Sequence, residues 1–134
     1  MAQTGLLDQA RDWLAVALGG GLGALARWRL SDAVQRRGGP YFPWGTLAVN
    51  VVGSFLLGFI MGAAVRGGVF SRWQRLLLAT GFAGAFTTFS TFMYESLVLL
   101  AREPLYGAAS MVASLVLGML GVYLGIVAAG VVYG

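Results

Sequence analysis

Four hydroxyl side chains within five residues form the part of this sequence best suited to handle an ion. They are Thr87, Thr88, Ser90 and Thr91, and glycines at positions 81 and 84 precede them. Such a dense run leaves polar groups that an apolar segment tolerates only inside protein or along a water-filled cavity. It predicts a helix broken near mid-membrane, whose half-helix ends can bind ions. A continuous helix whose hydroxyls bond to its own carbonyls is the alternative.

Two phenylalanines lie within this run. Phe89 and Phe92 are three residues apart, so they share one face of a helix. The edge of a phenyl ring carries partial positive charge and offers weak coordination to a small anion. Weak binding suits conduction, in which an ion must both enter and leave. Ordinary packing against lipid or protein is the alternative for two apolar rings.

Two further polar residues interrupt other apolar segments. Asn50, one turn after Thr46, carries an amide with two N–H donors that is costly to bury unpaired. We expect this amide either to bond another helix or to face an ion. Arg27 follows a glycine-rich stretch. Its guanidinium either reaches the membrane surface or supplies positive potential at the mouth of a pathway.

An acid and two serines complete the candidate set. Glu95 lies in the second half of the third apolar segment, where it can cap a broken helix or bind a proton. Ser110 and Ser114 share a stripe at four-residue spacing and either line a polar path or bond a neighbouring helix. Donors dominate the set and paired carboxylates are missing, which favours an anion. A cation held by backbone carbonyls at the break is the exception.

The elements that position these residues follow from composition. Of 134 residues, 58% are hydrophobic and 10% charged, against about 25% charged in soluble domains. These values exclude a soluble or disordered protein, and the scattered arginines disfavour nucleic-acid binding. Without Cys or His, disulfides and the commonest metal ligand are excluded. Uncharged runs near the ~20 residues of a spanning helix predict one all-α membrane domain, 1–134. Four transmembrane helices are expected at about 12–34, 45–66, 74–101 and 106–132.

The arginines give no preferred orientation in the membrane. With a cytoplasmic N-terminus, four flank the spans inside and four outside, and Arg27 is left out as intramembrane. The rule that cytoplasmic ends carry excess Lys and Arg then predicts insertion in both orientations. Because four helices enclose little room for a solvated path, we expect an antiparallel dual-topology homodimer. A single, weakly determined topology is the alternative. The inside set is Arg11, Arg66, Arg72 and Arg75, and the outside set is Arg29, Arg36, Arg37 and Arg102.

Three segments resemble the signatures of the Fluc (CrcB) fluoride channels. They are Gly20-x-x-Gly23-Ala24-x-x-Arg27, Gly45-Thr46-Leu47-x-x-Asn50-x-x-Gly53-Ser54-Phe55 and Gly84-x-Phe86-Thr87-Thr88-Phe89-Ser90-Thr91-Phe92. The resemblance implies an antiparallel homodimer with two pores in the lipid of the cytoplasmic (inner) membrane, crossed several times by each chain. Its expected activity is passive efflux of fluoride, with no covalent chemistry.

The resemblance also implies roles for single residues. Phe89 and Phe92 would line the pore, with Asn50 as an amide donor. Arg27 would lie near the aqueous vestibule. At the dimer interface a structural Na⁺ would bind the backbone carbonyls of Gly84 and Thr87.

Other residues match family positions, and the fourth helix departs from the pattern. The family commonly has a Tyr followed by a Ser four residues later. Here Tyr106 has that spacing to Ser110 but comes early, whereas Ser110 and Ser114 lie at the better depth. Thr91, Ser110 and Ser114 are also assigned to the pore. The further matching positions are Thr46, Thr88, Ser90 and Glu95.

Two other function classes are weighed against the channel. A small proton-coupled multidrug exporter needs an intramembrane carboxylate as its exchange site, for which Glu95 is the candidate. A purely structural subunit would carry no flux and leaves the hydroxyl run unexplained.

Overall fold

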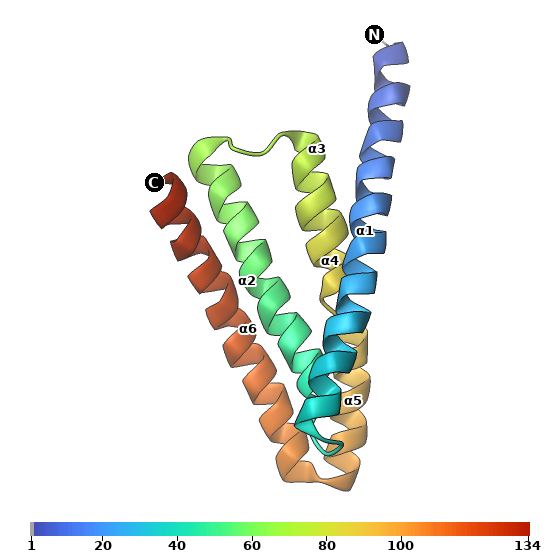
Figure 1. Ribbon diagram of the computed structural model, residues 1–134, viewed down its shortest axis with the longest axis vertical. Helices are drawn as coiled ribbons and strands as arrows, with labels where there is room; N and C mark the ends of the chain where they lie inside the picture. The colour runs from blue at the N-terminus through green and yellow to red at the C-terminus, as the bar shows by residue number, and fades with distance from the viewer. Residues whose placement is uncertain (1) are drawn as a thin grey trace.

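Every regular element of the computed structural model, which describes residues 2–134, is helical (Figure 1). The described residues contain no strand, which confirms the all-α prediction. In chain order the elements are α1 (Ala2–Gly38), α2 (Trp44–Gly67), α3 (Arg72–Arg75), the π-helical stretch η1 (Leu76–Ala83), α4 (Gly84–Phe86), α5 (Phe89–Arg102) and α6 (Pro104–Tyr133).

Three segments are long and apolar enough to cross a membrane: Trp44–Gly67, Arg72–Arg102 and Pro104–Tyr133. The middle one is built from α3, η1, α4 and α5 in succession. Helix α1 is the longest element but is not among these spans. Its uncharged stretch between Asp12 and Arg27 rises only about 21 Å, less than the ~30 Å of a bilayer core.

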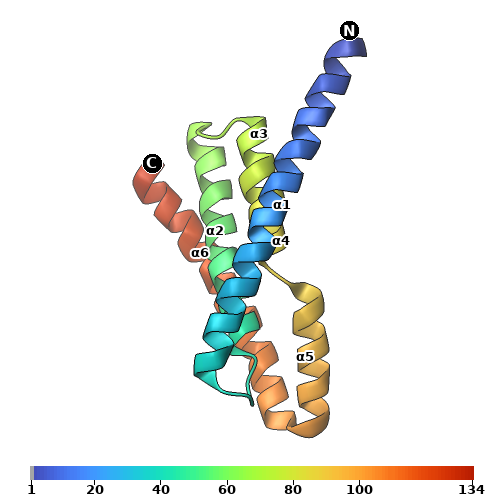
Figure 2. The ribbon, with the colours of Figure 1, turned by 45° about the vertical axis from the view of Figure 1, so that its right-hand side comes forward.

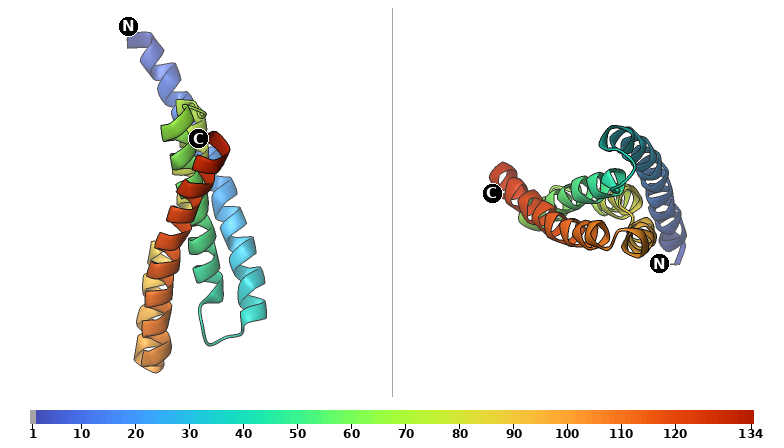
Figure 3. Two further views of the ribbon diagram at one scale, coloured as in Figure 1. Left: turned by 90° about the vertical axis from the view of Figure 1, so that its left-hand side faces the viewer. Right: turned by 90° about the horizontal axis from the view of Figure 1, so that it is seen from below.

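Helices α2 and α6 lie side by side along most of their length, and α1 crosses the third segment (Figures 1 and 3). Glycines allow the backbones to approach closely. A Cβ atom at Gly58 of α2 would overlap the Val122 carbonyl of α6, and one at Gly23 of α1 would overlap the Phe82 carbonyl of η1. In lipid, where apolar burial drives little association, such close backbone packing is a main source of helix–helix affinity.

The ends of the bundle are fastened by polar contacts. At one end Arg72 Nη2 lies 2.8 Å from Asp12 Oδ2, and the Trp73 indole donates to the Arg11 carbonyl at 3.2 Å. At the other end Gln35 holds the turn between α1 and α2. Its Nε2 donates to the Phe42 carbonyl at 3.0 Å, and its Oε1 accepts from the Gly45 N–H at 3.0 Å. These contacts align α1 with the helices on both sides of it.

Candidate functional site

The third segment is interrupted at Thr87 and Thr88, hereafter the break. Helix α4 ends at Phe86 and α5 begins at Phe89, while both residues between them have extended backbone angles. Figure 2 shows the chain passing as a thread from α4 to a displaced α5. The Thr88 hydroxyl accepts from the Thr91 N–H at 3.3 Å and so caps the new helix. The hydroxyl run therefore lies at an interruption, not in a continuous helix.

Asn50 of α2 binds both the backbone N–H and the backbone carbonyl of Thr88. Its Nδ2 donates to the Thr88 carbonyl at 3.0 Å, and its Oδ1 accepts from the Thr88 N–H at 2.7 Å. In a continuous helix that N–H would donate to the Gly84 carbonyl. The side chain thus replaces the helical hydrogen bond that the Thr88 N–H loses at the break, and one Asn50 amide hydrogen is left over.

Arg27 of α1 contacts the other end of the peptide group whose N–H donates to Asn50. Its Nη1 donates to the Thr87 carbonyl at 3.3 Å. The Thr87 hydroxyl in turn donates to the Ala83 carbonyl at 3.2 Å. Two consecutive residues of the break are therefore held from two different helices, α1 and α2.

The two phenylalanine rings contact each other at the start of α5. Their centroids are 6.4 Å apart with planes tilted by 59°. Phe92 is 6% exposed, whereas Phe89 is 75% exposed. Ser90 and Thr91 next to them are also exposed. One ring therefore belongs to the interior and the other projects from the surface of the single chain.

Two cavities lie along α5, one at its first turn and one along its remaining turns. The first, here the break cavity, has a volume of about 390 Å³. It gathers four of the predicted residues, Arg27, Thr46, Thr88 and Thr91. The second, here the end cavity, has a volume of about 430 Å³ and contains Glu95. Both are lined in part by Ser31 and Gln35 of α1, so they adjoin.

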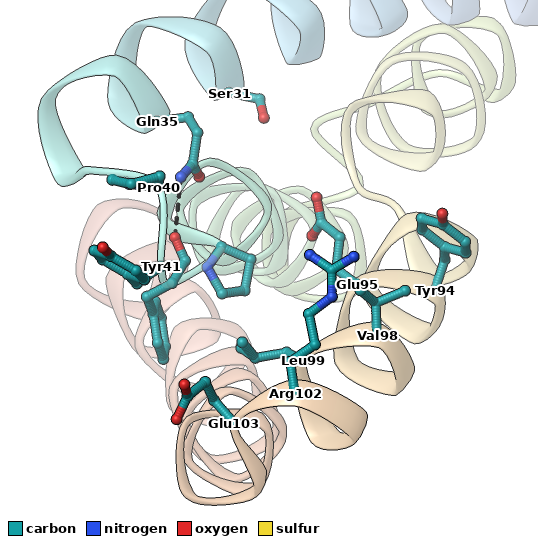
Figure 4. Close-up of a pocket in the computed structure, with 12 residues that line it drawn as sticks. Ser31, Gln35, Pro40, Tyr41, Tyr94, Glu95, Val98, Leu99, Arg102 and Glu103 are labelled. Carbon is teal, nitrogen blue, oxygen red and sulfur yellow. Dashed lines mark hydrogen bonds between the residues drawn. The ribbon is translucent and has the colours of Figure 1, made fainter.

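Figure 4 shows the end cavity, with Glu95 and Arg102 projecting from α5 and Gln35 and Ser31 from α1. Among the described residues, Glu95 Oε2 is buried without a hydrogen-bond partner. This buried carboxylate oxygen can accept a hydrogen bond from a group that enters the end cavity. Gln35 and Ser31 were not predicted as site residues. Their signal is weak, since a polar pair one turn apart near a helix end is common on any surface.

The serines of α6 do not line either of these two cavities. Ser110 is 1% exposed and Ser114 is half-buried. Within the described chain the Ser110 hydroxyl has no partner, and neither has that of Ser96, which is 2% exposed on α5. Ser96 was missed from sequence, although its place four residues after Phe92 puts it on the same helix face.

Residues 14–126 match the family described as "CrcB-like protein, Camphor Resistance (CrcB)". A protein of Geobacter sulfurreducens named fluoride-specific ion channel FluC is 48% identical over 117 residues, which cover 87% of this chain and 94% of that relative. One of Methanopyrus kandleri with the same name is 44% identical over 124 residues, covering 92% and 93%. One of Thermotoga maritima, also so named, is 41% identical over 117 residues, covering 87% and 92%.

Proposed function

Because this chain belongs to the CrcB family, we propose that it is a fluoride channel that gives passive efflux of fluoride across the cytoplasmic membrane. The relatives reported above are named fluoride-specific channels, so the multidrug-exporter alternative has no support. No bond is made or broken, and the chain is not an enzyme. A membrane potential negative inside drives the anion outward by about 2.3 kcal/mol per charge per 100 mV.

The observation that carries this proposal is the donor set around the break. The break cavity joins the Arg27 guanidinium to hydroxyls of Thr46, Thr88 and Thr91, and these groups can donate to fluoride. The Asp32 carboxylate, which also lines the cavity, is paired with Arg36. Phe89 and Phe92 each directly follow a residue that lines this cavity, Thr88 and Thr91 respectively. Fluoride would enter the cavity, lose water against the hydroxyls and the remaining Asn50 amide hydrogen, and pass the ring edges.

We propose four spans, with α1 as the fourth. Asp12 of α1 pairs with Arg72 at the start of the third segment. At the other end a Cβ at Gly45, the second residue of α2, would overlap the Ser31 carbonyl of α1. The helix from Asp12 to Ser31 rises about 28 Å, close to the ~30 Å of a bilayer core. This reading leaves Arg27 about one turn inside the membrane, at the mouth of the break cavity.

An antiparallel homodimer is proposed because a polar surface lies open halfway along the bundle. Thr80, Gly84, Ser90 and Thr91 are exposed along the broken segment. Lipid cannot satisfy such groups, and irregular backbone at membrane depth is tolerated only when protein or water covers it. A second copy covers them without any further partner. The balanced arginines allow that copy to insert in the opposite orientation.

We also propose Na⁺ at this interface, held by the carbonyls of Gly84 and Thr87. The Thr88 N–H donates to Asn50 and so releases the Gly84 carbonyl from its helical bond. The Thr87 carbonyl accepts from Arg27 and keeps its second lone pair. Oxygen ligands of this kind suit a hard cation, which takes several of them. The ion would supply positive charge beside the pores.

The remaining predicted residues are assigned around this path. Ser90 shares the exposed face with Phe89, and Glu95 would accept hydrogen bonds from groups in the end cavity. Ser110 and Ser114 would extend a polar track along α6, for which the buried, unpartnered Ser110 hydroxyl is the supporting observation.

Fluoride efflux from liposomes tests the channel directly. Purified protein is reconstituted with potassium fluoride inside, and efflux is started with valinomycin and followed with a fluoride electrode. We expect fast fluoride efflux, little chloride efflux, and strong loss of flux in Phe89→Ile. Equal chloride flux, or an unchanged rate in Phe89→Ile, would refute the mechanism. Reporter fusions at both chain ends test the dimer, because a single orientation would exclude the antiparallel arrangement.

A further inference from the structure

The contact between Asn50 and Thr88 pairs a side-chain amide with both backbone polar groups of one residue. Each supplies one donor and one acceptor, and the two bonds of 3.0 and 2.7 Å close a ring between residues 38 positions apart. Neighbouring strands satisfy each other in the same way when they exchange N–H and carbonyl groups. Asn50 therefore acts as a one-residue strand partner for an extended residue that has none.

Thr88 needs this partner because it is buried and lies outside both helices. It is 9% exposed. As the N-cap of α5 it can offer its carbonyl to the first turn of that helix, but its extended backbone leaves its N–H without a helical acceptor. Buried peptide groups are almost always paired. Without Asn50 the Thr88 peptide would turn toward another donor or toward water, and its backbone angles set the direction in which α5 departs. Phe89 is the very next residue.

The break cavity indicates which of the two residues meets the ion directly. Thr88 lines this cavity, whereas Asn50 is not among its lining residues. Two of the four hydrogen-bonding positions of the Asn50 amide remain, yet both of its polar atoms already contact Thr88. The main influence of Asn50 on the pore therefore passes through the backbone.

We propose that Asn50 is a positioning residue that, through the Thr88 peptide, sets the direction of α5 and so aims Phe89 and Phe92 into the pore. This inference rests on the proposed fluoride channel. It goes beyond the donor role of the remaining Asn50 amide hydrogen proposed above, because removing the Thr88 N–H while leaving the Asn50 side chain intact should then damage conduction.

The first test replaces Thr88 by its α-hydroxy analogue, which turns the N–H into an ester oxygen. In planar bilayers we expect the unitary fluoride current to fall by roughly three- to tenfold, the range of one buried hydrogen bond. The matched control is the same replacement at Leu105, the second residue of α6, whose N–H lies in the unbonded first turn. Its current should equal that of the unmodified protein.

A combined variant separates this bond from side effects of the ester, which also weakens the Thr87 carbonyl that accepts from Arg27. If Asn50 acts through the Thr88 N–H, adding Asn50→Ala to the ester should reduce the current by much less than Asn50→Ala does alone. Full additivity, or an unchanged current in the ester at position 88, would overturn the inference.

The second test reads the ring itself and does not depend on conduction. With 4-fluorophenylalanine at position 89, Asn50→Ala should shift or split the fluorine resonance. Ser54→Ala, one turn further along α2 and directed at α6, should leave it unchanged. An identical resonance in Asn50→Ala would overturn the positioning role. If the unmodified protein carries no fluoride, the proposed function fails and this resonance alone decides the inference.

Discussion

Gly53 of α2 packs directly against the break. Its replacement by a larger residue offers the sharpest test of how packing controls the pore. A Cβ built at Gly53 would overlap Cγ2 of Thr87 and lie 3.0 Å from Cδ1 of Phe86. The Thr87 side chain cannot simply rotate away, because its hydroxyl donates to the Ala83 carbonyl at 3.2 Å. Gly53→Ala must therefore either break that hydrogen bond or push the break away from α2.

The size of the effect follows from a comparison with Gly118 of α6, which is the matched control. A Cβ there would lie 3.7 Å from Ser54 Oγ, an ordinary contact. Both substitutions gain about 1 kcal/mol of helix propensity, so this term cancels between them. Overpacking at position 53 should cost about 1–3 kcal/mol, with about 0.5–1.5 kcal/mol more if the Thr87 hydrogen bond is lost.

Two assays measure the expected loss of stability and the expected loss of conduction. Unfolding in mixed micelles titrated with a denaturing detergent should show Gly53→Ala less stable than Gly118→Ala by at least about 1 kcal/mol. Liposome efflux should show fluoride flux retained in Gly118→Ala and reduced severalfold in Gly53→Ala, because the break carries Thr88 and Phe89 with it. If both variants were equally stable and equally conductive, the reasoning from close packing at the break would be wrong.

Three further outcomes are expected. Asp12→Asn removes the ion pair with Arg72, in which the Asp12 side chain is 21% and the Arg72 side chain 78% exposed. It should lower the free energy of unfolding by less than about 1 kcal/mol. A much larger loss in the micelle assay would contradict a surface contact. Ser110→Ala removes a buried, unpartnered hydroxyl, so the protein should be as stable or more stable in the same assay while fluoride efflux falls; normal efflux would exclude Ser110 from the path. Replacing Na⁺ by N-methylglucamine on both sides should lower fluoride current in bilayers, and an unaffected current would remove Na⁺ from the proposal.

The helices were largely predictable because apolar runs and their breakers are local features. The second expected span, 45–66, corresponds to α2 at Trp44–Gly67, and the fourth, 106–132, to α6 at Pro104–Tyr133. The first was expected at 12–34, but α1 extends from Ala2 to Gly38. Charged residues mark where a helix leaves an apolar environment and do not stop it from continuing, so charge patterning underestimated α1.

The break was predictable in kind, since four hydroxyls and two glycines in one short stretch oppose a regular apolar helix. Its stereochemistry was not. That Asn50 pairs with the Thr88 peptide and Arg27 with the Thr87 carbonyl depends on how α1 and α2 pass the third segment. Ser96, Ser31 and Gln35 carry no distinctive spacing, and only packing brings them to buried or cavity-lining positions.

Composition and spacing alone therefore determined that this is a small, helical membrane protein with one interrupted segment, because hydropathy and helix breaking act over a few neighbouring residues. The sequence motifs also determined the family to which it belongs. The tertiary structure decided which polar groups share a cavity, which peptide groups of the break are held and by which helix, and which ring is buried. Those properties arise between residues far apart in the sequence, such as Arg27 and Thr87, which are 60 positions apart. They depend on the close approach of the helix backbones that the glycines allow.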